Sequence, residues 1–291
     1  MKPARPFPAK LLVSGEFTVI RGGDALAIPF PKFAGIWERG AEPDTSLLPL
    51  VQYLQKIDYI DSGRLHDDIL EGWQFRSTIP PGYGLGSSGA LSAALVYHYG
   101  REISEDTGIL QKQLAGVEDY FHGTSSGFDP LVSYKGQGIA WIGKSLVRVP
   151  DPLSSGPLMS FLYVIDSGMA RGHIHAISWY LEQLKQPVFL PVVEELNDLN
   201  HRLVQAWFEQ DLQAAEDLFF QVSGLQWKWF QPLITAGVAG IWQKGLESGK
   251  YAVKLCGKGG GGYYLLWSKD PEIGALIGQE PVPVQERKLS A

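Results

Sequence analysis

The chain has 291 residues, of which 45% are hydrophobic and 19% charged, as is typical of a globular protein. This length is enough for one large domain or for two smaller domains that share a cleft. The 25 Lys and Arg residues and the 31 Asp and Glu residues give a formal charge of −6. The dense basic face that a nucleic-acid partner requires is therefore not expected.

Cysteine content and the N-terminal residues predict the cellular compartment. Cys256 is the single cysteine, so no disulfide can form within the chain and a cysteine-based zinc site is disfavoured. We therefore expect a reducing, cytoplasmic location. Prolines occupy the place of a signal peptide's apolar core, and no apolar run approaches the roughly 20 residues of a membrane helix. We expect neither a secretion signal nor a membrane partner.

The first third of the chain predicts strands followed by a helix. Short apolar stretches broken by glycine indicate two strands and a turn over residues 10–30. Another strand is expected over 73–79, where two prolines end it, and the small and apolar residues over 90–99 favour a helix. Residues 41–70 mix proline, aspartate and aliphatic side chains and predict no definite element.

The middle of the chain predicts a helix and then strands. Apolar residues recur at helical spacing from Leu110 to Phe121, and Ser104 is the expected N-cap. Residues 129–149 alternate and contain two glycines, which indicates strands. Within them, residues 138–145 match the Walker A pattern Gly-x4-Gly-Lys-Ser. Their bulky apolar interior and the strand-like residues that follow favour a β-hairpin over a phosphate loop.

A segment rich in proline, serine and glycine at residues 151–157 predicts a boundary between two domains. Beyond it we expect a buried strand over 161–165 and three helices, the second of them capped by Asp211. Two strands around a glycine loop are expected over 251–267. This mixture of strands and helices indicates the α+β or α/β class.

A glycine- and serine-rich loop at residues 82–89 lies between a predicted strand and a predicted helix. Glycines let the backbone approach phosphate oxygens, and the first amides of the helix point at a bound anion. Ser87 and Ser88 add hydroxyls that can reach a phosphate or a metal ion. On composition alone, a tight turn that packs the helix closely on a sheet is an equally good interpretation.

The order of residues in this loop is more specific than its composition. Residues 80–89, Pro-Pro-Gly-Tyr-Gly-Leu-Gly-Ser-Ser-Gly, resemble the phosphate-binding motif Pro-x-x-x-Gly-Leu-Gly-Ser-Ser-Ala of the GHMP kinases, with Gly89 at the alanine position. That family includes galactokinase, homoserine kinase, mevalonate kinase and phosphomevalonate kinase. The resemblance implies that ATP binds at Pro81, Gly82, Gly84, Leu85, Gly86, Ser87, Ser88 and Gly89.

Two further segments resemble the mevalonate kinase forms of the family's motifs. Residues 10–17, Lys-Leu-Leu-Val-Ser-Gly-Glu-Phe, resemble Lys-x-x-Leu-x-Gly-Glu-His, with Phe17 in place of the histidine. Residues 118–129, Glu-x3-His-Gly-x-Ser-Ser-Gly-Phe-Asp, resemble Glu-x3-His-Gly-x-Pro-Ser-Gly-x-Asp. Residues 127–131 are also similar to a bacterial subgroup named for a Gly-Tyr-Asp-Ile-Ala string.

The resemblance implies a role for each of these motif residues. Lys10 would hold the acceptor hydroxyl and stabilise charge near the transferring phosphoryl group, and Asp129 would act as base or orienter for that hydroxyl. Glu118 and Ser88 would coordinate Mg²⁺. Taken singly, Lys10 reads as a solvated side chain, Glu118 as part of a solvated helix face and Asp129 as a turn residue. His122 is interpreted as a structural hydrogen-bonding residue.

A third glycine segment completes the set. Residues 254–262, Lys-Leu-Cys-Gly-Lys-Gly-Gly-Gly-Gly, resemble Lys-Leu-Thr-Gly-Ala-Gly-Gly-Gly-Gly, which implies that Gly257, Gly259 and Gly260 close against the phosphate loop. Cys256 is expected to be a buried small residue, and Lys258 to face either the phosphates or solvent. Residues 166–171 are weakly similar to a mevalonate kinase segment ending in arginine near the substrate; a surface arginine is an equally good interpretation.

Together the motifs imply an α+β, two-domain GHMP kinase fold that binds ATP and Mg²⁺ in a cleft. Residues 1–152 would resemble ribosomal protein S5 domain 2 and residues 153–291 a ferredoxin-like domain. The implied reaction is direct transfer of the ATP γ-phosphoryl group to a small-molecule alcohol, with mevalonate as the first candidate. The alternatives are phosphomevalonate kinase, a kinase for another small alcohol, the more distant diphosphomevalonate decarboxylase, or a non-catalytic metabolite sensor. Whether the protein is a homodimer is left open.

Overall fold

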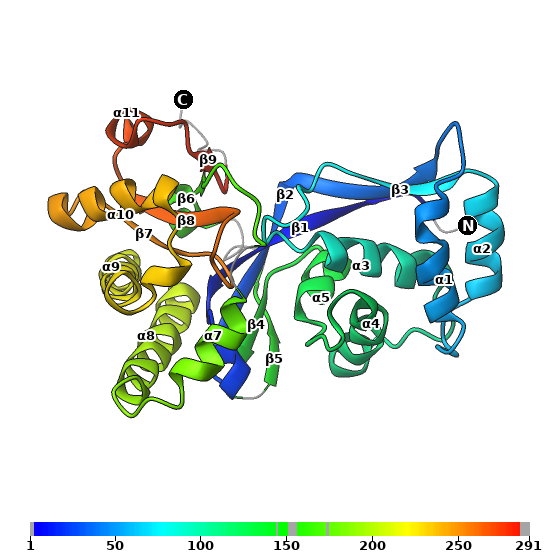
Figure 1. Ribbon diagram of the computed structural model, residues 1–291, viewed down its shortest axis with the longest axis horizontal. Coiled ribbons are helices and arrows are strands. Elements are labelled where there is room, and N and C mark those ends of the chain that lie inside the picture. The colour runs from blue at the N-terminus through cyan, green and yellow to red at the C-terminus, as the bar shows by residue number, and fades with distance from the viewer. Residues whose placement is uncertain (1–2, 144, 151–155, 173–174, 286–291) are drawn as a thin grey trace. The chain divides into compact units, whose positions relative to one another are not determined.

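The computed structural model describes residues 3–143, 145–150, 156–172 and 175–285 (Figure 1). The chain divides into two compact units. Unit 1 contains residues 1–10, 29–80 and 85–139, and unit 2 contains residues 11–28, 81–84 and 140–291. The predicted boundary between residues 152 and 153 lies outside the described residues and stays a prediction.

Two long strands, β1 (Pro6–Ser14) and β2 (Ala25–Arg39), have residues in both units. They belong to a five-stranded sheet of order β1-β2-β4-β5, with β4 spanning Ile139–Ile142 and β5 spanning Ser145–Arg148. The fifth strand, β3 (Trp73–Ser77), pairs antiparallel with the end of β2. Because β4 and β5 are neighbouring strands, the hairpin interpretation of the Walker-like segment is confirmed; Lys144 itself lies outside the described residues.

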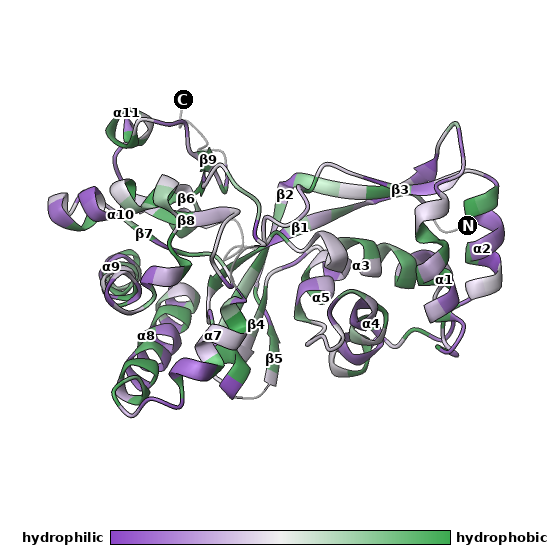
Figure 2. Ribbon diagram, in the orientation of Figure 1, coloured by the Kyte–Doolittle hydropathy of each residue, from purple (hydrophilic) through white to green (hydrophobic). Residues whose placement is uncertain are grey.

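Unit 1 is built around one buried helix. The unit contains α1 (Leu48–Leu54), α2 (Ser62–Leu70), α3 (Ser87–Tyr99), α4 (Thr107–His122) and α5 (Phe128–Lys135). Helix α3 packs against both α4 and α5, and nine of its 13 residues are buried. Figure 2 shows that α3 is hydrophobic along most of its length, whereas α4 also carries hydrophilic residues. The burial of α3 fixes the position of the glycine-rich loop at its N-terminus.

Unit 2 contains an antiparallel sheet of order β7-β8-β6-β9, formed by β7 (Tyr251–Leu255), β8 (Tyr263–Ser268), β6 (Leu162–Asp166) and β9 (Val282–Pro283). Every residue of β7 and β8 is buried. The helices of this unit are α7 (Ala176–Gln183), α8 (Leu190–Glu209), α9 (Leu212–Trp229), α10 (Ala236–Ser248) and α11 (Ile273–Ile277). Helices α9 and α10 pack against β7, and α8 packs against α9. Among the described residues, no helix is long and apolar enough to cross a membrane.

Two expectations from the sequence are wrong. Ser104 is not the N-cap of α4; Asp106 is, because its carboxylate accepts the backbone N–H of Ile109 at 2.9 Å. Residues 128–135 form a helix rather than a strand. Gly127 and Gly136 stand on either side of it with φ angles of 69° and 61°, in the left-handed region that ends helices. Asp129 therefore lies in the first turn of α5 and not in a loop.

Candidate active site

The glycine-rich loop leads directly into α3, as the sequence predicted. Gly82, Gly84 and Gly86 have φ angles of 76°, 77° and 72°, which L-residues with side chains rarely adopt. Gly86 is the N-cap of α3, so Ser87 and Ser88 occupy the first helical turn. The backbone N–H groups of that turn have no partner within the helix and carry the positive end of its dipole. This geometry suits an anion such as a nucleotide phosphate.

Lys10 and Asp129 form an ion pair in unit 1, with 3.0 Å between Lys10 Nζ and Asp129 Oδ2. The side chain of Lys10 is 8% exposed and that of Asp129 is 35% exposed, so the pair is sheltered yet open to a ligand. The backbone N–H of Lys10 donates to the carbonyl of Leu85 at 2.9 Å. A Cβ atom on Gly86 would lie 3.0 Å from Lys10 Cγ and 3.6 Å from Asp129 Oδ2. The loop backbone thus passes directly beside the pair.

Glu118 is buried on α4, and each of its carboxylate oxygens accepts a hydrogen bond from a hydroxyl group. Ser88 Oγ donates to Glu118 Oε1 at 3.3 Å, and Ser125 Oγ donates to Glu118 Oε2. The imidazole Nε2 of His122 lies 3.0 Å from Ser88 Oγ. The carboxylate and the loop serine therefore share one hydrogen-bonded cluster in unit 1, and His122 is part of it.

The surroundings of Glu118 change its acidity. Burial, and after it the negative charge of Asp129, raise the pKa of Glu118, while the hydrogen bond from Ser125, the charge of Lys10 and the hydrogen bond from Ser88 lower it. The net result is a pKa of about 7. A carboxyl group with this pKa releases its proton to solvent readily when a cation binds beside it.

The residues present fit a magnesium ion that is bound together with a nucleotide. Among the described residues, no group of three or more His, Cys, Asp and Glu side chains is arranged to hold a metal ion. Ser88 and Glu118 offer hard oxygen donors, and Mg²⁺ is commonly held by one or two carboxylates, with phosphate oxygens and water as its other ligands. A single buried carboxylate next to a phosphate loop is consistent with that mode of binding.

In unit 2, Arg171 lies against both glycine segments of that unit. Its Nε donates to the carbonyl of Gly261 at 3.1 Å, its Nη2 donates to the carbonyl of Cys256, and its backbone N–H donates to the carbonyl of Gly82 at 2.8 Å. A Cβ atom on Gly84 would collide with the guanidinium group. Arg171 therefore connects residues 82–84 with residues 256–261, so the structure makes it more than a surface arginine.

Cys256 and Lys258 are the two residues that depart from the family's third motif. Cys256 is buried, as expected. Lys258 is exposed, but partial desolvation and then the charge of Arg171 lower its pKa. Gly257, Gly259 and Gly260 have φ angles of 75°, 68° and 73°, and the backbone N–H of Gly260 donates to Leu233 at 2.8 Å. This loop needs glycine for its backbone conformation.

Glu16 and Phe17 of the first motif are both buried in unit 2. Glu16 forms an ion pair with Lys254, and both side chains are fully buried. Lys254 Nζ also donates to the backbone carbonyls of Val13 and Leu255, at 3.0 Å each, so its charge is well satisfied. Phe17, where the family has histidine, packs with its ring centroid 5.0 Å from that of Tyr180. The replacement puts an aromatic core contact where the family's motif has a polar side chain.

The structure thus gathers the predicted site residues in two groups. In unit 1 it brings together Lys10, Leu85, Gly86, Ser87, Ser88, Gly89, Glu118 and Asp129. In unit 2 lie Pro81, Gly82, Gly84, Gly257, Gly259 and Gly260. The sequence predicted His122 only as a structural hydrogen-bonding residue and did not single out Ser125, and both contact this cluster. The serine at the motif's proline position was the available signal.

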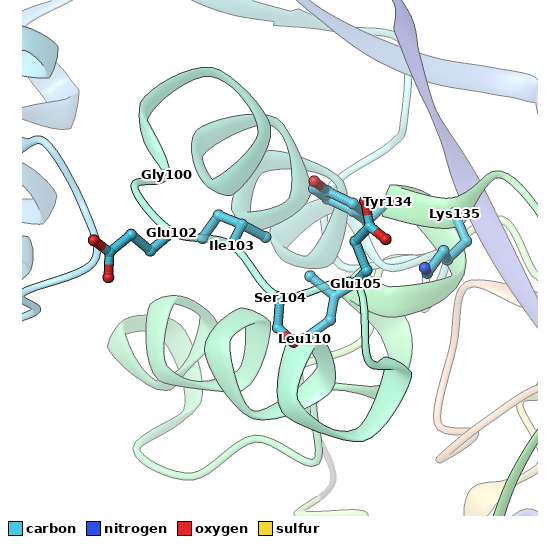
Figure 3. Close-up of a pocket in the computed structure, with 8 residues that line it drawn as sticks. All are labelled: Gly100, Glu102, Ile103, Ser104, Glu105, Leu110, Tyr134 and Lys135. Carbon is cyan, nitrogen blue, oxygen red and sulfur yellow. The ribbon is translucent and has the colours of Figure 1, made fainter.

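Unit 1 also has a hollow of about 750 Å³ outside this cluster (Figure 3). Its lining residues are Gly100, Glu102, Ile103, Ser104, Glu105, Leu110, Tyr134 and Lys135. None of them belongs to a glycine motif, and Figure 3 shows Glu102 directed away from the other side chains. The ionisable side chains of the lining are two carboxylates, Tyr134 and Lys135.

Comparison with known proteins finds a matching domain model and similar folds. The sequence model of the GHMP kinases N terminal domain matches residues 51–137. Comparison with curated protein sequences yields no match. Among solved structures, the mevalonate kinase of Methanococcus jannaschii is 15% identical, with a TM-score of 0.63 and coverage of 96% of both chains. The phosphomevalonate kinase of Streptococcus pneumoniae is 17% identical, with a TM-score of 0.63, and covers 96% of this chain and 97% of its own.

A galactokinase from Lactococcus lactis, solved with galactose, is also similar, at 12% identity and a TM-score of 0.64, over 94% of this chain and 88% of its own. The fold is therefore the α+β fold of the GHMP kinases, as expected from the motifs. Residues 51–137 thus match the N-terminal domain of the GHMP kinases, and the chain has the fold of mevalonate kinase structures. The similar structures are kinases of different acceptors, so the acceptor of this chain is left to be proposed.

Proposed function

We propose that this protein transfers the γ-phosphoryl group of ATP to the hydroxyl of a small-molecule alcohol, with mevalonate as the acceptor. The observation that carries the proposal is the Lys10–Asp129 ion pair, which lies beside Gly86 of the phosphate-type loop. A sensor protein would need to bind its ligand, but it would not need this pair together with the Ser88–Glu118 cluster.

The proposed chemistry assigns one task to each group. The Asp129 carboxylate accepts the proton of the acceptor hydroxyl as that oxygen attacks the γ-phosphorus, and the bond from phosphorus to the ADP oxygen breaks. The ammonium group of Lys10 stabilises the negative charge of the transferring group. The amides of the loop and of the first turn of α3 hold the phosphates. Ser88 and Glu118 would hold Mg²⁺, which supplies positive charge to the phosphate oxygens when bound.

Mevalonate is supported by the motifs of residues 10–17 and 118–129 and by the likeness to mevalonate kinase structures. Phosphomevalonate is the second candidate, and Lys258 favours it. This lysine stands beside Arg171 where the family's motif has a small residue, and the additional positive charge suits a more anionic acceptor.

An ADP-release assay with Mg-ATP tests the proposal against mevalonate, phosphomevalonate, homoserine, galactose and diphosphomevalonate. We expect release with mevalonate, and we expect Asp129→Asn to bind ATP normally while its kcat falls roughly 10²- to 10⁴-fold, because the proton acceptor is lost. Undiminished turnover in this variant would remove Asp129 from the mechanism. Bound ATP without release for any acceptor would favour a sensor, and release with diphosphomevalonate requires a measurement of carbon dioxide.

A further inference from the structure

Ser125 contacts the buried carboxylate of the candidate metal site. It stands where the family string Glu-x3-His-Gly-x-Pro-Ser-Gly-x-Asp has proline, a residue without any side-chain donor. Its hydroxyl donates to Glu118 Oε2, while Ser88 donates to the other oxygen at 3.3 Å. This chain therefore gives Glu118 a hydrogen-bond donor that the family's motif does not provide.

The hydroxyl of Ser125 is held in one orientation. Its oxygen accepts the backbone N–H of Gly127 at 2.9 Å, so its own hydrogen is left to donate to Glu118. The backbone N–H of Ser125 donates to Asp119 Oδ1 at 2.6 Å, which ties the residue to the last turn of α4. Ser125 is only partly exposed. The donor is thus fixed relative to the helix that carries Glu118.

We propose that Ser125 is a positioning residue that holds the Glu118 carboxylate in the orientation in which Oε1, on the Ser88 side, receives the metal ion of the nucleotide complex. This inference rests on the proposed function. A metal-ligating carboxylate that is already hydrogen-bonded loses less conformational freedom on binding, and its ligating oxygen is fixed. Ser125 itself touches neither the nucleotide nor the acceptor in this proposal, because its donor is used on Glu118 Oε2.

Ser126 provides a matched control in the same turn. Its hydroxyl accepts the backbone N–H of Phe128 at 3.3 Å, just as that of Ser125 accepts the N–H of Gly127, two residues further on in both cases. Ser126 is exposed, and no hydrogen bond joins its side chain to Glu118 in the described residues. Removal of either hydroxyl costs one local turn contact, and only removal of the Ser125 hydroxyl takes a hydrogen-bond donor away from Glu118.

The experiment compares Ser125→Ala with Ser126→Ala in the full chain. Electron paramagnetic resonance measures the Kd of Mn²⁺ in the presence of a non-hydrolysable ATP analogue, and calorimetry measures binding of the analogue without metal. We expect Ser125→Ala to raise the Mn²⁺ Kd about 10- to 100-fold, the range found for lost partners of metal ligands, with metal-free analogue binding unchanged. Ser126→Ala should stay within about twofold of wild type, because it leaves Glu118 in place.

Ser125→Cys keeps the size of the side chain and replaces the hydroxyl by a weak donor, so its Mn²⁺ Kd should lie between those of wild type and Ser125→Ala. This variant also tests the inference if Ser125→Ala does not fold. Equal Mn²⁺ affinity in wild type and the folded Ser125 variants would overturn the inference. Failure of the wild-type protein to bind the Mn²⁺–analogue complex at all would instead overturn the proposed function.

Discussion

Gly89 lies in α3 and packs against Asp129, the residue that we propose as the base. A Cβ atom at this position would lie 3.0 Å from Pro130 N and 3.2 Å from Asp129 Cβ, so these neighbours would have to move by a few tenths of an ångström. The family's motif has alanine here, so the glycine is matched to the close packing of α5 on α3 in this chain. Alanine at position 89, which looks conservative in the sequence, would therefore displace Asp129.

We predict that Gly89→Ala lowers kcat about three- to tenfold and leaves the Tm nearly unchanged. The gain in helix propensity, roughly 1 kcal/mol, offsets the crowding, whereas the shift of Asp129 impairs the alignment of the acceptor. Steady-state kinetics and thermal denaturation measure the two effects. Gly224→Ala is the control, because Gly224 is helical and a Cβ there would meet no atom within 4 Å. It should raise the Tm with kcat unchanged, and the same outcome for Gly89→Ala would contradict the argument.

At the scale of elements, Arg171 links two loops of unit 2. Its guanidinium donates to Gly261 and Cys256 and occupies the space beside Gly84. The guanidinium is the free end of a flexible side chain, so a side chain at position 84 would expel it rather than unfold the loop. Gly84→Ala and Arg171→Ala should therefore disturb the same contact between residues 82–84 and residues 256–261.

We predict that each of these variants raises the KM for ATP several-fold and that the double variant is little worse than the single ones. Two substitutions that break one shared interaction are not additive in free energy. A double-mutant cycle on kcat/KM measures the coupling. Gly136→Ala controls for the left-handed backbone, because Gly136 has φ 61° and open space around it. If the effects of the two substitutions simply add, Arg171 does not join the loops.

Elements with strong local signals were predictable. The strands and the glycine loop of residues 251–268 and the Asp211 cap of α9 follow directly from turn residues, alternation and capping chemistry. Helix α5 was missed because it has only eight residues, and its bounding glycines were interpreted as strand punctuation. The cap at Asp106 was missed because Ser104 lies two residues earlier and is equally able to cap by type.

At the scale of the whole molecule, the order of the three glycine motifs was enough to predict the α+β GHMP fold. Individual long-range contacts were not predictable in this way. The buried pair of Glu16 and Lys254 joins residues 238 positions apart, and a single sequence gives no signal for their contact. The hydrogen bond from Ser125 to Glu118 depends on how residues 123–127 fold back on α4, which follows no periodic pattern.

The burial of Glu118 should make the free energy of unfolding depend on pH. Its pKa rises from 4.5 to about 7 in the folded state, mainly through burial, so the folded protein holds this proton more tightly than the unfolded chain does. Because the pKa of this carboxyl group is raised in the folded state, the free energy of unfolding falls as the pH rises from about 4.5 to about 7. Above pH 7 the folded state carries the buried charge at full cost.

We predict that Glu118→Gln, which cannot ionise, is more stable than wild type by about 2–3 kcal/mol at pH 8, while at pH 4 the two stabilities approach each other. Urea unfolding of both proteins at several pH values, without nucleotide or metal, measures this difference. The same variant should lose Mg²⁺-dependent turnover, because the amide is a poor ligand for the ion. A stability difference that does not change with pH would show that Glu118 is not strained by burial. The predicted result means that the fold gives up stability to keep a carboxylate ready for a cation, as functional sites commonly do.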